Sequence, residues 1–144
     1  MSPFLSDLEI VIKDAVGADV QIQARGVSTM HEKCWHRPII GEGLTDMTVP
    51  IDHLARLQRN VFANIAINRD ESVYVLPGSH FEQLSSEFLE MMQRDSSAEI
   101  PGEVRIRLSP GDVWFYNGCL AMRSRNDKNK QRLTLQITGI PDPT

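Results

Sequence analysis

The chain has 144 residues, 41% of them hydrophobic, and a formal net charge of -4 at pH 7. We expect a single domain over residues 1–144, because this length suits one hydrophobic core and leaves little room for a second. The acidic balance argues against a nucleic-acid partner, and no segment approaches the roughly 20 apolar residues of a membrane span, so a small molecule is the expected partner.

The cysteines and the start of the chain predict a cellular location. Cys34 and Cys119 are far apart and lack CxxC spacing, which argues against a disulfide framework and against a structural zinc site. The start, MSPFLSDLEIVIKD, carries acidic residues where a signal peptide has a basic region followed by a long apolar one. We therefore expect a soluble, cytoplasmic protein.

The first half of the chain predicts one helix, one strand and a long loop. A capping-box pattern followed by apolar residues at helical spacing predicts a helix over residues 6–16. Residues 20–25 alternate apolar and polar side chains, which is typical of a half-buried strand. Residues 41–60 mix Gly, Pro and charged residues without a period, so we expect a loop there with at most one helical turn.

The second half predicts mainly strands. Alternation and Val, Ile and aromatic content predict strands over residues 60–67, 72–76, 103–108, 112–117 and 131–138. One helix is expected within residues 81–95, where apolar residues share a helical face and Ser85 or Ser86 can cap the start. Helical crossovers are too few for a parallel sheet, so the prediction is a mainly β jelly roll or barrel with one or two short helices.

Several motifs resemble those of one enzyme family. The segments WHRPI, SVYVLPGSH and LSPGDVWFYNGCLAMRSRN, followed by QRLTL, resemble the phytanoyl-CoA dioxygenase family of Fe(II)- and 2-oxoglutarate-dependent oxygenases in order and spacing. VLPGSH together with the later PGD turn is the most specific match. The resemblance implies a double-stranded β-helix, a cupin-like jelly roll that holds Fe(II) through a His-x-Asp pair and a distal His. It also implies an arginine that binds 2-oxoglutarate.

The metal-ligand positions implied by this resemblance are only partly filled. His36 stands at the first ligand position, but Pro38 stands where the family has its Asp and offers no side-chain donor. Met122 stands where the distal His is expected, and a thioether is a poor ligand for iron(II). We therefore expect His36 to be a remnant ligand in a degenerate site that binds no iron tightly.

The cosubstrate position is better preserved. Arg132 matches the arginine that binds 2-oxoglutarate, at a spacing from Met122 slightly shorter than the family's, and Thr134 matches the hydroxyl that accompanies it. A planar guanidinium binds a carboxylate through two hydrogen bonds. We expect Arg132 and Thr134 to bind a small organic acid, although an arginine that opens a strand can equally be a solvated edge residue.

Other donors could take part in a different site. His80 follows the turn in PGSH, and we expect it to be structural or to line the mouth of a pocket. His31, Glu32, Asp46 and His53 are the remaining side chains that could complete a metal site around the first ligand position.

Three functions follow from these residues. The first is a non-catalytic relative that binds a small organic acid or a protein partner. The second is an active oxygenase that hydroxylates a small molecule with a non-standard metal set. The third is a cupin-like isomerase or lyase that uses His36 or His80 as an acid or base. Few residues precede His36 compared with the helical region of the family, so we also expect a homo-oligomer that covers exposed sheet.

Overall fold

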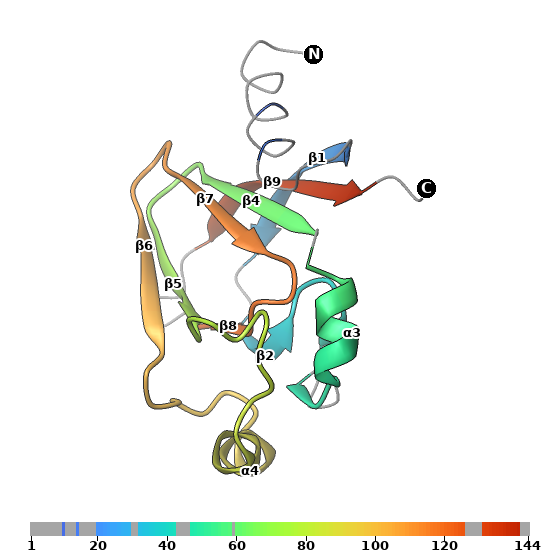
Figure 1. Ribbon diagram of the computed structural model, residues 1–144. Coiled ribbons are helices and arrows are strands. Elements are labelled where there is room, and N and C mark those ends of the chain that lie inside the picture. The colour runs from blue at the N-terminus through green and yellow to red at the C-terminus, as the bar shows by residue number, and fades with distance from the viewer. Residues whose placement is uncertain are drawn as a thin grey trace.

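The structure is a computed structural model, and it describes residues 10, 14, 20–29, 32–42, 47–58, 60–125 and 131–141. Within these residues the chain forms two antiparallel sheets and two helices (Figure 1). The helix expected over residues 6–16 lies outside this description apart from Ile10 and Asp14.

The first sheet, here called the major sheet, has four strands in the order β1-β9-β4-β7. Its strands are β1 (Val20–Thr29), β9 (Arg132–Pro141), β4 (Val61–Ala66) and β7 (Val113–Asn117). The first and last strands of the described chain are direct neighbours, with Val20 opposite Pro141 and Thr29 opposite Arg132. The major sheet is therefore assembled from segments that are far apart in sequence.

The second sheet, here called the minor sheet, has five strands in the order β3-β2-β8-β5-β6. They are β3 (Gly41–Glu42), β2 (Lys33–Arg37), β8 (Met122–Ser124), β5 (Asp70–Val75) and β6 (Val104–Leu108). Along most of its length the chain passes back and forth between the two sheets, as a jelly roll requires. The predicted double-stranded β-helix is thus confirmed.

The core follows from the period-two alternation of side chains along the strands. Phe62 and Tyr116 of the major sheet pack with Val73, Val75 and Met122 of the minor sheet, so these residues face the space between the sheets. Alternate residues of the major sheet form a separate cluster on its other face, which contains Ala63, Ile65 and Ile137. Strands β4 and β7 of the major sheet thus contribute to two apolar layers.

The two helices are α3 (Ile51–Arg56) and α4 (Ser86–Arg94). Ser85 caps α4, because its hydroxyl accepts a hydrogen bond of 3.2 Å from the backbone amide of Phe88. Met92 of α4 is buried in one cluster with Trp35, whose strand lies in the minor sheet. In the part of the chain that the structure describes, neither helix is long and apolar enough to cross a membrane.

The structure confirms the predicted strands with shifted ends and corrects the reading of three segments. Residues 41–60, expected to be a loop with at most one helical turn, contain β3 and α3. Strands β2 and β8 were not predicted, because β8 has only three residues and its pairing with β2 depends on the fold. The strand expected from residue 72 begins at Asp70, within a segment whose composition suggests a turn.

Candidate functional site

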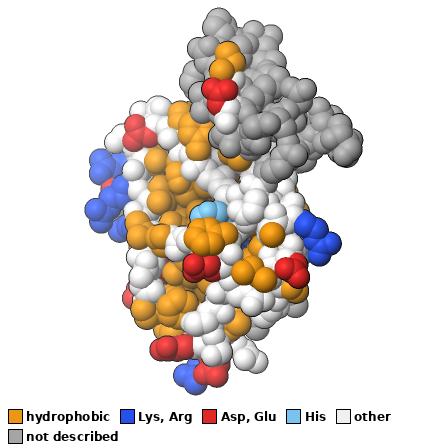
Figure 2. All heavy atoms as spheres, in the orientation of Figure 1, with side chains coloured by type: hydrophobic (Ala, Val, Ile, Leu, Met, Phe, Trp, Pro, Cys, Tyr) orange, Lys and Arg blue, Asp and Glu red, His pale blue; other side chains and the backbone are white. Residues whose placement is uncertain are grey.

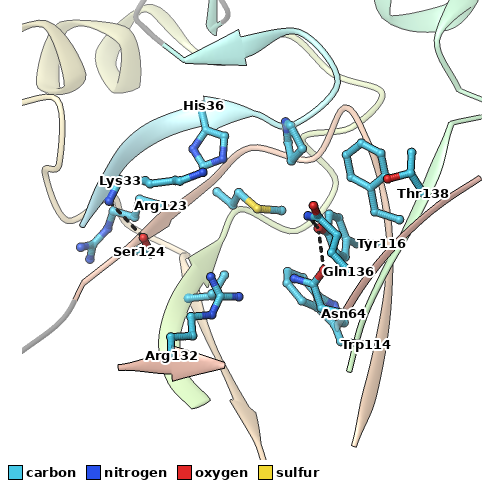
Figure 3. A pocket seen from close by; sticks show the side chains of 14 residues that line it. Lys33, His36, Asn64, Trp114, Tyr116, Arg123, Ser124, Arg132, Gln136 and Thr138 are labelled. Atoms are coloured by element: carbon cyan, nitrogen blue, oxygen red, sulfur yellow. Dashed lines mark hydrogen bonds between the residues drawn. The ribbon is translucent and has the colours of Figure 1, made fainter. Parts of the chain in front are cut away.

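A cavity of about 320 Å³ lies between the two sheets (Figure 3). The major sheet contributes the side chains of Phe62, Asn64, Trp114, Tyr116, Gln136 and Thr138. The minor sheet and the turn after β2 contribute Lys33, His36, Pro38, Val73, Met122 and Ser124. Arg132, at the start of β9, also lines the cavity. A cavity of this size is near the lower limit for ligand pockets and suits a small metabolite.

His36 and Met122 lie opposite each other on neighbouring antiparallel strands, and both line the cavity. Nδ1 of His36 lies 2.8 Å from the carbonyl oxygen of Cys34. Because a carbonyl only accepts, Nδ1 carries a proton and donates it to this oxygen. Pro38 lies on the same cavity wall.

This donor set does not fit the iron(II) that the fold implies. One imidazole, one thioether and a proline side chain without a donor replace the two imidazoles and one carboxylate of a facial triad. Among the described residues, no group of three or more His, Cys, Asp or Glu side chains is placed to hold a metal ion.

The other candidate donors are not gathered at the cavity. Glu32 and His53 are exposed and do not line it. His80 packs edge-on against Phe81, with ring centroids 4.6 Å apart. Burial lowers the pKa of His80, and the nearby positive charge of Arg37 lowers it further, so this ring is neutral at pH 7. His31 and Asp46 lie outside the described residues.

Arg132 forms an ion pair at one end of the cavity. Its Nε donates a hydrogen bond of 2.5 Å to Oδ2 of Asp70. No other partner of its guanidinium occurs in the described chain, so the two terminal nitrogens remain available, and 21% of the side chain is exposed. A guanidinium held at Nε and open at its terminal nitrogens can still bind a carboxylate with those two donors.

Asp70 is the residue that holds Arg132, and the sequence reading missed it. A register shift between Asp70 and Val73 interrupts the β5–β6 ladder, and such irregularities re-aim side chains. The backbone amide of Ser72 donates to Oδ1 of Asp70 at 2.9 Å, and the Ser72 hydroxyl donates to the same oxygen. The Asp-x-Ser pattern, which favours this local hydrogen bond, was the available signal.

Asp70 is ionised at neutral pH although its side chain is buried. Burial alone would raise its pKa, but the charge of Arg132 and the hydrogen bonds from Ser72 outweigh burial and hold the pKa below its ordinary value of 3.8. The Arg132–Asp70 pair is therefore a true ion pair at this end of the cavity.

Thr134 lies two residues after Arg132 on β9. Alternation along β9 puts both residues on the same face of the strand, but Thr134 does not line the cavity. Its hydroxyl oxygen is buried and has no hydrogen-bond partner among the residues that the structure describes. A buried hydroxyl without a partner is costly.

The major-sheet wall opposite His36 carries a connected set of neutral polar groups. The Tyr116 hydroxyl donates to Oδ1 of Asn64 at 3.2 Å, and Nε2 of Gln136 lies 3.5 Å from the same hydroxyl (Figure 3). Trp114 stacks on Tyr116 with ring centroids 4.3 Å apart. The sequence reading treated these residues only as strand formers. The available sequence signal was a polar side chain at a strand position that alternation places on the inward face, as at Asn64 and Gln136.

No protein-family sequence model and no curated protein matches the chain. Several solved structures do match it. EctD from S. alaskensis, solved with 2-oxoglutarate and 5-hydroxyectoine, gives a TM-score of 0.67 at 20% identity, covering 94% of this chain and 49% of EctD. HygX from Streptomyces hygroscopicus, solved with iron bound, gives 0.65 at 16% identity, covering 98% of this chain and 68% of HygX.

A third match is the non-heme alpha-ketoglutarate-dependent epimerase SnoN from nogalamycin biosynthesis, with a TM-score of 0.60 at 12% identity over 93% of this chain and 52% of SnoN. The chain thus spans about half the length of EctD and SnoN. These likenesses establish that it has the double-stranded β-helix fold of these 2-oxoglutarate-dependent enzymes, and a shared fold does not by itself transfer an activity.

Proposed function

We propose that this chain is an oxygenase-like protein that binds a small organic acid through Arg132 and does not use iron(II). The observation that carries the proposal is the contrast inside one cavity. Arg132 keeps two terminal guanidinium nitrogens available at one end, while His36 faces Met122 and Pro38 replaces a carboxylate at the other.

The protein would bind its ligand by ordinary polar contacts. A carboxylate accepts two hydrogen bonds from Arg132 while Asp70 holds the guanidinium from its other edge. The aromatic side chains of Trp114 and Phe62 exclude water from the ligand's apolar part. With no metal to hold a second group, we expect weak binding, with a Kd of about 1 mM.

The test is a calorimetric or ligand-observed NMR titration with 2-oxoglutarate and succinate. Arg132→Lys should weaken binding about tenfold, because an ammonium cannot make the two-pronged contact. Arg69→Lys is the matched control, since this neighbouring arginine is 70% exposed and pairs with Glu71 outside the cavity. No binding by the unmodified protein at millimolar ligand, or equal binding by the Arg132 variant, would contradict the proposal.

The alternative, an active oxygenase with a different metal set, has its own test. We expect the purified protein to carry no stoichiometric iron and to consume no 2-oxoglutarate, since one histidine does not replace three ligands. Micromolar Fe(II) affinity that disappears in His36→Ala would favour the alternative instead.

We also propose that the protein self-associates in the cytoplasm. Ile51, Phe81 and Val104 are exposed by 52%, 50% and 46%, and hydrophobic side chains gather across the middle of the face in Figure 2. Exposed apolar surface of this kind favours association. Light scattering that gives a monomer mass at tens of micromolar protein would contradict it.

A further inference from the structure

The charges that line the cavity are already paired at its buried positions. Arg132 pairs with Asp70, and Arg123, whose side chain is 1% exposed, pairs with Glu103 at 2.7 Å. Lys33 also lines the cavity, but it is exposed, so water and salt screen its charge. A ligand carboxylate at Arg132 therefore meets a guanidinium whose positive charge is already partly neutralised by Asp70.

The opposite wall offers hydrogen bonds without charge. Asn64, Tyr116, Gln136 and Thr138 line it from β4, β7 and β9. Each of these side chains carries both a donor and an acceptor. A carboxylate only accepts, so it could use the donors of this wall but would leave its acceptor oxygens without a partner. An amide or a hydroxyl can satisfy donors and acceptors alike.

The two features lie along the same strand. Arg132 and Gln136 are four residues apart on β9 and share a face, which separates their Cα atoms by about 13 Å. An extended ligand in the cavity can therefore have one end at the guanidinium and the other at the neutral wall. The end at the neutral wall also lies across from His36 (Figure 3). Met122 is the strand partner of His36, and no group of three or more His, Cys, Asp or Glu side chains among the described residues is placed to hold a metal ion.

We infer that the ligand is a monocarboxylate whose far end carries a neutral hydrogen-bonding group, such as a carboxamide or hydroxyl, and not a dicarboxylate. This inference rests on the proposed acid binding and narrows its ligand class. A second carboxylate would be desolvated with only the exposed and screened charge of Lys33 beside the two paired arginines, and burying a poorly paired charge is costly. In an enzyme with bound metal, the metal ion supplies that missing positive charge.

Asp70 is the specificity-determining residue in this scheme. Its carboxylate orients Arg132 and also cancels one positive charge next to the bound acid. Removing the charge while keeping an oxygen that accepts from Arg132 Nε would leave the guanidinium in place and make the site more cationic. The preference for a singly charged ligand should then decrease.

The experiment compares ligand pairs that differ by one charge but have the same shape. Succinate is titrated against succinamate, and glutarate against glutaramate, by calorimetry at neutral pH and low salt. We expect the amide acid to bind about tenfold more tightly in at least one pair, which corresponds to about 1.4 kcal/mol. Butyrate, which lacks the polar end of succinamate, should bind more weakly than succinamate.

Asp70→Asn tests the origin of the preference. It should tighten binding of the dicarboxylate more than that of the amide acid, so the preference decreases to about threefold or less. Glu71→Gln is the matched control, because it removes the same charge from a side chain that pairs with Arg69 and not with Arg132; it should leave the preference unchanged. Thermal melting checks that both variants are folded.

The outcomes separate this inference from the proposed function. If the dicarboxylate binds as tightly as its amide acid, the inference is wrong while acid binding stands. If butyrate equals succinamate, the neutral wall plays no part and the inference also fails. If no acid of either kind binds at millimolar concentration, the proposed function itself fails. A preference that Asp70→Asn leaves intact would remove Asp70 as its cause.

Discussion

The two ends of the cavity differ in how many side chains their chemistry needs. At one end, iron(II) would require three converging donors, and the substitution of two of them leaves His36 facing a thioether. At the other end, one guanidinium and one orienting carboxylate are enough to receive an acid, and both are present. Under the proposed function, a site that depends on a single cation persists where a site that depends on cooperating donors is lost.

The strongest test of this contrast is to restore metal ligands at the end of the cavity that contains His36. Pro38→Asp together with Met122→His should raise the affinity for Co(II) or Ni(II) about 1,000-fold over the unmodified protein, because the carboxylate and the distal imidazole are restored beside His36. A titration followed by Co(II) absorption measures it. Each single substitution, as a control, should recover much less than the pair.

Two results would weaken the comparison. If the double variant binds metal no better than the unmodified protein, then His36 is not in a ligand position. The positions of His36, Pro38 and Met122 would then resemble the family's metal site in sequence alone. If the unmodified protein already binds metal tightly, the described residues do not account for the site.

A second prediction contrasts two arginines of the same cavity. Arg123 pairs with Glu103 through Nε and Nη2 and lies over the ring of Tyr74 at 4.3 Å, while its buried Nη1 has no hydrogen-bond partner among the described residues. Arg123→Ala should lower the free energy of unfolding by about 3 kcal/mol, because it leaves Glu103 without its partner. Urea denaturation measures this loss.

Acid binding by the folded Arg123→Ala protein should stay within about twofold of the unmodified protein. A loss comparable to that of Arg132→Lys would mean that the two arginines act on the ligand together, and the contrast drawn between them would be wrong.

The smallest effect concerns the Asp70–Arg132 pair and pH. The folded-state pKa of Asp70 lies below its ordinary value of 3.8, so the ionised pair stabilises the fold above that value and its contribution disappears as pH falls through the folded-state pKa. Asp70→Asn lacks this contribution at every pH. The gap in unfolding free energy between the two proteins should be about 1–2 kcal/mol at pH 7 and should shrink in acid.

Urea titrations at several pH values between 2 and 7 measure this gap. A gap that stays constant over the whole range would show that the lost stability comes from packing and not from the charge of Asp70.

The sequence predicted most strands because their alternation is local, and it failed where structure depends on partners. Strand β8 has only three residues, MRS, and exists because β2 and β5 flank it. Arg132 was found through its position in a motif. Asp70 was missed because a ladder irregularity, and not periodicity, aims its side chain. Gln136 and Asn64 were missed because an alternating pattern does not say which face encloses a cavity.

The position of β9 between β1 and β4 bears on how the protein is made. This strand joins the first strand of the described chain to the middle of the sheet and also carries Arg132 and Gln136 into the cavity. Pairing of segments so distant in sequence is slow, because the chain loses the entropy of loop closure before the stabilising contacts between the strands form. During synthesis on the ribosome the earlier strands must wait for β9 to emerge. If the protein binds an acid as proposed, a nascent chain would be unable to do so until its sheet closes, and a bound acid would favour the last step of folding.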